Sequence, residues 1–261
     1  MALSTAQQAA LALTPKFSGT LSLLSSLWIL LDVVADKSKR NKLYHRILLG
    51  FSLADIMVSP FYAASTWPIP RSDDVLWSVG NKATCDIQGF FIQAGTAAFV
   101  YNASLTVYFV LVIRYGMVEA KLKRYEALFL GIPWLFGLGT ATASLVLDQY
   151  ANSVLWCWIS GQGNAAYFRW GTNYCPLWFF FLVVLAGMAM VFCTVRQKAR
   201  QTAKLDAHQK VRESIEGSNK SWFRRKKRQN KLDRRTQQVA TQCLLYSECR
   251  ASVGERDRER E

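Results

Sequence analysis

The stretch CDIQGFFIQAGTAAFVYNASLTVYFVLVIRY, Cys85 to Tyr115, decides the fold of this 261-residue chain. From Ile87 to Ile113 it carries no charged side chain. That run makes about 40 Å of helix at about 1.5 Å per residue, against a hydrocarbon core of about 30 Å. The stretch therefore predicts a membrane-spanning helix. Its amide and hydroxyl side chains are too numerous for a helix surrounded by lipid, so we expect most of them to face other helices of a bundle.

Two further apolar runs precede this helix and two follow it. The chain is 51% hydrophobic yet carries a net charge of +14, with its Lys and Arg residues gathered between alternate pairs of apolar runs. A nucleic-acid-binding protein would carry such charge on a soluble fold. We therefore exclude nucleic acid as a partner and expect membrane lipids instead. The sequence predicts an all-α transmembrane bundle of five spanning helices within residues 1–195. The expected spans are about 9–35, 45–67, 85–115, 126–147 and 171–195.

The distribution of basic residues predicts the orientation of the bundle. Segments 36–46, 114–124 and 196–235 hold 5, 4 and 15 Lys and Arg residues. The opposite side holds only four: Lys16, Arg71, Lys82 and Arg169. Because positive loops stay in the cytoplasm, we expect an integral membrane protein with its N-terminus outside, in the plasma membrane.

Beyond the fifth span we expect a basic cytoplasmic segment, 196–247, and a charged, disordered tail, 248–261. Strong helix formers after Val195 favour an extension of the fifth helix until Gly217 and Ser218 end it. Segment 196–247 also holds the cytoplasmic start of a sixth helix. Five consecutive basic residues are candidates for binding anionic lipid, although a solvated loop is an equally good interpretation: Arg224, Arg225, Lys226, Lys227 and Arg228.

The sequence contains no arrangement of residues typical of an enzyme. It has only two histidines, His45 and His208, both in basic segments, and no Cys-x-x-Cys, Walker or Gly-x-Ser-x-Gly pattern. We therefore predict no catalytic activity, no metal site and no cofactor.

Several short motifs occur in the order in which seven-helix receptors carry them. SLADI at Ser52–Ile56 resembles the Ala-Asp element in helix two of rhodopsin-like receptors, and IRY at Ile113–Tyr115 stands where that family has an acidic-Arg-Tyr triplet. Other motifs resemble the cyclic-AMP-receptor-like branch: GN-x-x-TC-x-x-QGFFIQ, YN-x-SL-x-x-Y, PW, CWI and CPLW. From about Phe17 to Val195 the chain thus resembles the G-protein-coupled receptor superfamily.

This resemblance implies that the full-length form of the protein signals through a heterotrimeric G protein in response to an extracellular ligand of unknown identity. It implies a disulfide between Cys85 and Cys157, which the topology places on the same side of the membrane. It makes Arg114 and Tyr115 candidates for facing the G protein. Asp55, Gln93 and Asn102 become candidates for ligand contacts or interior polar groups.

The chain also departs from the family. Ile113 replaces the acidic residue before Arg114, and the Trp-x-Pro and Asn-Pro-x-x-Tyr elements of helices six and seven do not occur. We therefore expect a truncated receptor.

Alternative interpretations remain open at this stage. Asp55, Gln93 and Asn102 would equally serve as hydrogen-bonding groups between helices, and Arg114 as a charge that sets topology. A five-helix transporter or channel subunit, with Asp55 as its ion site, is a rival function. A third possible function is that of a fragment that pairs with a full-length receptor.

Overall fold

The computed structural model describes residues 5–73, 75–216, 233 and 237 of the chain. The basic run 224–228 and the tail 248–261 lie outside the described residues. So does the expected start of a sixth helix, apart from residues 233 and 237. The chain divides into two compact units. Met1–Val112 and Gly116–Leu185 form the first unit, and Ile113–Tyr115 and Ala186–Glu261 form the second.

Within the described part, five helical segments are long and apolar enough to cross a membrane. They are Gln7–Ala35, Leu43–Ala64, Lys82–Arg114, Glu119–Val146 and Gly163–Gln209. The prediction of an all-α bundle with five spanning helices is therefore confirmed, and the protein is an integral membrane protein.

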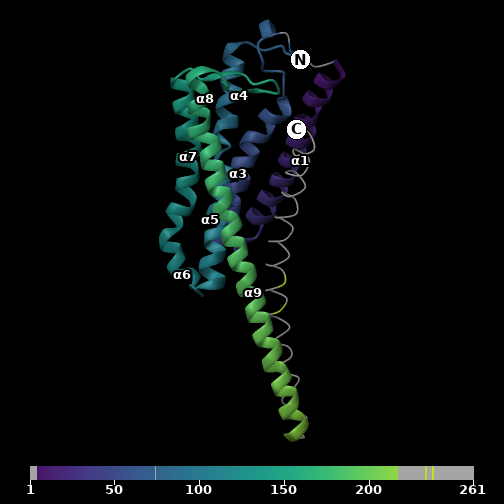
Figure 1. The fold of residues 1–261 in the computed structure, drawn as a ribbon, viewed down its shortest axis with the longest axis vertical. Coiled ribbons are helices and arrows are strands. Elements are labelled where there is room, and N and C mark those ends of the chain that lie inside the picture. Colours follow the sequence, from purple (N-terminus) through teal and green to yellow (C-terminus); the bar gives the residue numbers. More distant parts are fainter. Residues whose placement is uncertain (1–4, 74, 217–232, 234–236, 238–261) are drawn as a thin grey trace. The chain divides into compact units, whose positions relative to one another are not determined.

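The segments between the spans add short helices and one small sheet to the bundle (Figure 1). The elements up to the end of the third span are α1 Thr5–Ala35, α2 Lys37–Arg40, α3 Leu43–Ala64, η1 Arg71–Asp73, α4 Lys82–Ala94, α5 Ala97–Phe109 and η2 Val110–Arg114. The remaining elements are α6 Glu119–Leu122, η3 Lys123–Tyr125, α7 Glu126–Val146, β1 Tyr150–Asn152, β2 Cys157–Ile159, α8 Gly163–Arg169, η4 Trp170–Tyr174 and α9 Cys175–Glu216.

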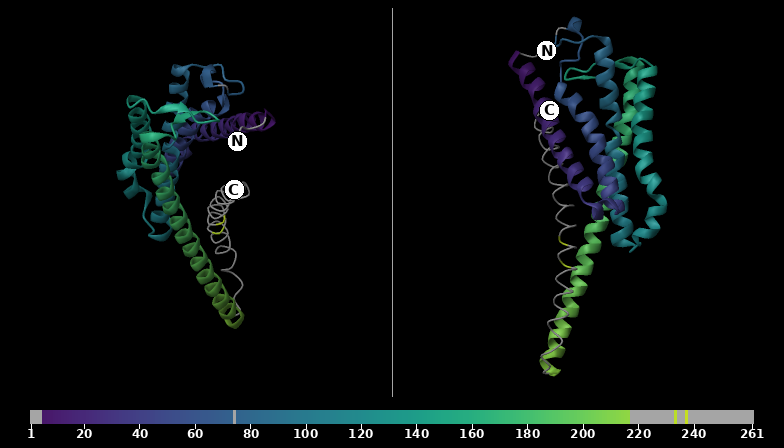
Figure 2. Two further views of the ribbon diagram at one scale, coloured as in Figure 1. Left: turned by 45° about the horizontal axis from the view of Figure 1, so that its top comes forward. Right: turned by 180° about the vertical axis from the view of Figure 1, so that it is seen from behind.

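In the first unit, α1 packs on α3, α3 packs on α5, and both α4 and α5 pack on α7 (Figures 1 and 2). The core between α3 and α5 includes Ile47 and Tyr101, which are 0% and 1% exposed. Gly50 of α3 permits this packing, because a Cβ atom there would lie 2.6 Å from the Tyr101 hydroxyl oxygen. That hydroxyl donates to the carbonyl oxygen of Leu130 in α7 over 2.9 Å, so one tyrosine connects three spans.

The central span is interrupted where α4 meets α5, at Gly95 and Thr96. The Asn81 side chain caps the start of α4 by accepting from the backbone N–H of Thr84 over 3.0 Å. A Cβ atom at Gly95 would lie 2.7 Å from Cγ2 of Val58, so this glycine lets α3 approach the break closely. The uncharged run thus folds as two α-helices and a terminal π-turn rather than as one uniform rod.

A β-hairpin in the loop after α7 was not predicted. Strands β1 and β2 pair antiparallel, with Tyr150 opposite Ile159 and Asn152 opposite Cys157. Strands of three residues are too short to show an alternating pattern in the sequence. The fold therefore contains a little sheet that an all-α prediction leaves out.

Helix α9 is 42 residues long and is described as far as Glu216. Its first residues, Cys175–Leu185, belong to the first unit, and the remainder belongs to the second. The predicted extension of the fifth helix beyond Val195 is therefore present.

Candidate functional site

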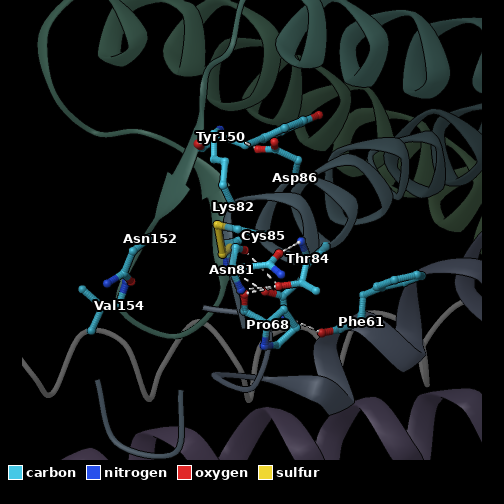
Figure 3. The surroundings of a disulfide bond; sticks show 12 residues. Phe61, Pro68, Asn81, Lys82, Thr84, Cys85, Asp86, Tyr150, Asn152 and Val154 are labelled. Atoms are coloured by element: carbon cyan, nitrogen blue, oxygen red, sulfur yellow. Dashed lines mark hydrogen bonds and ion pairs between the residues drawn. A yellow bond between two sulfur atoms is a disulfide. The ribbon is translucent and has the colours of Figure 1, made fainter. Parts of the chain in front are cut away.

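The disulfide joins the start of α4 to the start of β2 (Figure 3). Cys85 and Cys157 have their Cα atoms 5.1 Å apart and are 1% and 0% exposed. They pack with Ile69, which is also fully buried. The predicted bond between Cys85 and Cys157 is confirmed. It anchors the β-hairpin over the first turn of the central span.

Lys82 lies beside the disulfide and joins α4 to the loop after α7 (Figure 3). Its ammonium nitrogen is 2.6 Å from an Asp86 oxygen and 2.7 Å from an Asp148 oxygen. The same nitrogen donates to the carbonyl oxygen of Tyr150 over 3.0 Å. One cation therefore neutralises two carboxylates at this end of the bundle.

Tyr150 of β1 packs its ring on α4. A Cβ atom at Gly89 would lie 2.6 Å from the ring, so only glycine lets the two elements approach this closely. The Tyr150 hydroxyl donates to the carbonyl oxygen of Ala141 over 2.9 Å. Burial raises the pKa of this phenol, which therefore stays protonated and keeps its role as a donor.

Gln88 holds the hairpin to α4 and to the end of α3, and the sequence analysis did not single it out. It is fully buried. Its amide nitrogen donates to the carbonyl oxygens of Phe61 and Ser65 over 2.9 and 2.8 Å. Its amide oxygen accepts from the backbone N–H of Cys157 over 2.8 Å.

Gln93, a predicted site residue, is the centre of a second buried network. Its amide nitrogen donates to the Thr140 hydroxyl of α7 over 3.2 Å. Its amide oxygen accepts from the Trp158 indole N–H over 2.8 Å and from the Asn173 side chain over 3.5 Å. One fully buried amide thus connects α4, α7, β2 and η4.

Arg169 continues this network toward the surface. Its guanidinium carbon lies 4.2 Å from the centre of the Trp158 ring and 5.3 Å from that of Tyr174. It donates to the Tyr174 hydroxyl over 2.7 Å, and its Nε is buried without a hydrogen-bond partner among the described residues. The sequence contained a sign that Arg169 has a role at this site. It is one of the few cations on the side with little charge, and it stands within a loop rich in aromatic residues.

Asp55, also predicted as a site residue, accepts hydrogen bonds from two helices. The hydroxyls of Ser22 and Ser26 in α1 each donate to its Oδ2 over 2.7 Å. Ser59, one turn further along α3, donates to the same oxygen over 3.2 Å. The carboxylate therefore joins α1 to α3.

Asn102 does not join the networks of Asp55 or Gln93. Its backbone carbonyl accepts from the Thr106 hydroxyl over 2.9 Å, and its half-buried side chain has no hydrogen-bond partner among the described residues. The structure thus gives Gln93 and Asp55 several partners each and leaves the Asn102 side chain with none in the described part.

Arg114 and Tyr115 belong to the second unit, at the end of the π-turn η2. Both side chains are exposed. Arg114 donates to the Thr194 hydroxyl of α9 over 3.4 Å, and Lys198 donates to the carbonyl oxygen of Ile113 over 2.8 Å. Thr194 thus contacts the arginine that lacks an acidic neighbour at position 113.

No group of three His, Cys, Asp or Glu side chains suited to a metal ion occurs in the part of the chain that the structure describes. Cys175 and Cys193 are free and exposed.

Comparison with solved structures identifies the architecture. The crystal structure of squid rhodopsin superimposes with a TM-score of 0.62 at 13% sequence identity, over 79% of this chain and 58% of rhodopsin. The fold is that of rhodopsin. The receptor-like resemblance inferred from the motifs between Phe17 and Val195 is therefore confirmed.

The sequence comparison agrees with the receptor fold. An ascaroside receptor of Arthrobotrys oligospora is 24% identical over 183 residues, which is 69% of this chain and 44% of that receptor. The chain thus spans less than half the length of this curated relative. No protein-family model matches the chain.

Proposed function

We propose that this protein is a membrane receptor that binds a ligand at its outer end and signals through a heterotrimeric G protein, without catalysis. The receptor fold and the similarity to a named receptor support this proposal. The orientation, with the N-terminus outside and the basic segments in the cytoplasm, is supported by the distribution of Lys and Arg residues. The plasma membrane is the proposed location.

The observation that carries the proposal is the network of Gln93. It joins the disulfide-anchored hairpin to two spanning helices through side chains that a ligand can compete with. A ligand group that replaced Trp158 or Asn173 as a partner of Gln93 would change how α4, α7 and η4 are held together. Ligands act on conformation only through such differences in binding between two states.

Arg169 adds a positive charge beside this network, and it has no carboxylate partner among the described residues. The relative is named for ascarosides, so an ascaroside is the first probe for this receptor. Asp55 and Asn102 are secondary candidates, because the Asp55 carboxylate is already occupied by three serine hydroxyls.

At the cytoplasmic end we propose that Arg114 and Tyr115 contact the G protein. Both are exposed, and the side-chain hydrogen bond of Arg114 in the described part of the chain is the long one to Thr194. We also propose that the run Arg224–Arg228 binds anionic lipid at the cytoplasmic surface, since each basic residue near such a surface contributes about 1 kcal/mol.

The test is guanine-nucleotide exchange on purified heterotrimeric G proteins, with the full chain in lipid nanodiscs and an ascaroside mixture as the probe. If the five described spans suffice for coupling, we expect exchange above that of empty discs, and we expect Arg114→Ala to abolish it. Arg200→Ala, which removes an exposed cation from α9, is the matched control and should leave exchange unchanged. Absence of exchange with every G-protein class and probe would contradict G-protein coupling.

A further inference from the structure

A groove on the first unit is not used by the proposed receptor function. It has a volume of about 590 Å³ and lies among α5, η2, the loop 116–125, α7 and the start of α9. Its floor is buried, with Val100, Ala103 and Leu122 at 4%, 5% and 0% exposed. Its walls are open to the outside, with Leu128 and Phe179 at 54% and 61% exposed.

The groove is apolar through most of its length. The side-chain hydroxyls among its lining residues are those of Ser104 and Tyr125. Neither hydroxyl has a hydrogen-bond partner in the described part of the chain. Because α5 and α7 both lie within spanning segments, the open side of the groove faces lipid rather than water.

The depth of the groove matches one leaflet of a bilayer. Its lining runs along α5 and η2 from Val100 to Leu111, which is about 17 Å at about 1.5 Å per residue, and along α7 from Leu128 to Ile132. Half of a hydrocarbon core is about 15 Å. The groove thus has its boundary end at Tyr125, which is 47% exposed in η3, and extends over about the thickness of one leaflet.

Positive charge lies at the boundary end. Lys123 and Arg124 immediately precede Tyr125 in η3, and both are exposed. Nearby carboxylates are already engaged, since Glu126 pairs with Arg46 and Glu119 accepts from the backbone N–H of Leu43 over 2.6 Å. Neither Lys123 nor Arg124 has an ion-pair partner among the described residues. An apolar groove thus ends at two cations without a counter-charge.

We propose that this groove is a binding site for an anionic phospholipid, with one acyl chain along Ala103 and Ser104 and the phosphate at Lys123 and Arg124. Basic pockets between spanning helices on the cytoplasmic side are suited to such head groups. The small side chains of Ala103 and Ser104 leave room for the chain, while the exposed Leu128 and Phe179 flank it. This site is made of residues of the described bundle.

The test is native mass spectrometry of the full chain in detergent, titrated with phosphatidylserine or phosphatidylcholine of the same acyl chains. We expect phosphatidylserine to bind more tightly, and Lys123→Gln with Arg124→Gln to weaken it about tenfold. The matched control is Lys37→Gln with Arg40→Gln, which removes two exposed cations from α2 at the same predicted side of the membrane. It should leave the preference unchanged.

A second pair of variants tests the groove itself. Ser104→Phe should fill it and lower phosphatidylserine binding about fivefold, whereas Ser25→Phe adds the same ring to an exposed position of α1 and should not. A phosphatidylserine with a photoreactive acyl chain should label the peptide that contains Leu128 and Ile132 in the unaltered protein. This labelling is measured on the unaltered protein, so its result does not depend on whether a variant folds.

Three outcomes would overturn the proposal. Equal losses in the Lys123/Arg124 and Lys37/Arg40 variants would mean that charge alone attracts the lipid. Loss of preference only on replacing Arg224–Arg228 would place the site elsewhere. Equal binding of phosphatidylcholine, or of a sterol that ignores Lys123 and Arg124, would show a general lipid contact.

Discussion

At the scale of single residues, two buried glutamines organise the end of the bundle that carries the disulfide. Gln88 uses its amide nitrogen twice and its oxygen once, always on backbone groups, which suits a structural role. Gln93 contacts three side chains, which are groups that can exchange partners. The sequence analysis selected Gln93 as a site residue and did not select Gln88. Both glutamines stand in the same uncharged run, and the sequence does not show which of them bonds to backbone groups and which to side chains.

Gln88→Leu should destabilise the protein by about 3 kcal/mol. The leucine has a similar volume but leaves the N–H of Cys157 and the carbonyls of Phe61 and Ser65 without this partner, at about 1 to 3 kcal/mol for each group left buried and unpaired. Thermal unfolding in detergent measures the change. Gln162→Leu, at an exposed position before α8, should shift the midpoint little. Equal shifts would show that the Gln88 hydrogen bonds contribute nothing.

The disulfide should contribute about 4 kcal/mol, because it closes a loop with a sequence separation of 72. Cys157→Ser should lower the unfolding midpoint by as much as adding reductant to the unaltered protein does. Mass mapping of unreduced peptides should recover the linked pair. If both thiols are alkylated in the intact protein, the bond is absent.

At the scale of elements, hydrogen bonds hold α1 against α3. Ser22 and Ser26 of α1 both donate to Asp55 of α3. A carboxylate within a span costs about 2.5 to 3.5 kcal/mol on insertion scales, and three hydroxyl donors offset part of that cost. The hydrogen bonds from Ser22 and Ser26 to Asp55 could not be predicted from the sequence. The apolar residues of α1 lie on all sides of the helix, so they do not indicate which side faces α3.

A double-mutant cycle of Ser26→Ala and Asp55→Asn should show a coupling of about 0.5 to 2 kcal/mol, the range found for hydrogen bonds between spanning helices. Unfolding of each variant in mixed detergent micelles supplies the four free energies. Ser25→Ala is the control, because that hydroxyl donates to Leu21 within α1 and should not couple to Asp55. Coupling as large for Ser25 as for Ser26 would refute the assignment.

At the scale of the whole molecule, the sequence predicted the parts that the bilayer dictates. Span length and count follow from hydrophobic thickness, so the five spans were expected from apolar runs alone. The break at Gly95, the π-turn Val110–Arg114 and the hairpin arise instead from contacts between distant segments. Close approach of Gly95 to Val58, and of Gly89 to Tyr150, cannot be deduced from a local pattern. The contact of Arg114 with Thr194 is of the same kind.

The proposed orientation predicts which loops face the cell exterior. In a background with Cys175, Cys193, Cys243 and Cys249 replaced by serine, Gln162→Cys should react with a thiol reagent that cannot cross membranes, in sealed cells. Lys123→Cys should react only after the cells are permeabilised. Both positions are exposed, so accessibility does not bias the comparison. The reverse labelling pattern would invert the topology.

The disulfide also has a consequence for the order of events during synthesis. Cys85 precedes Cys157 by 72 residues, so at about 5 to 20 residues per second its thiol waits roughly 4 to 15 s for its partner to be made. During that interval the segments that become α5 and α7 must already enter the membrane. An oxidant that acts before Cys157 is made finds Cys85 without its partner. The time at which this bond forms therefore reports that the third and fourth spans are in place.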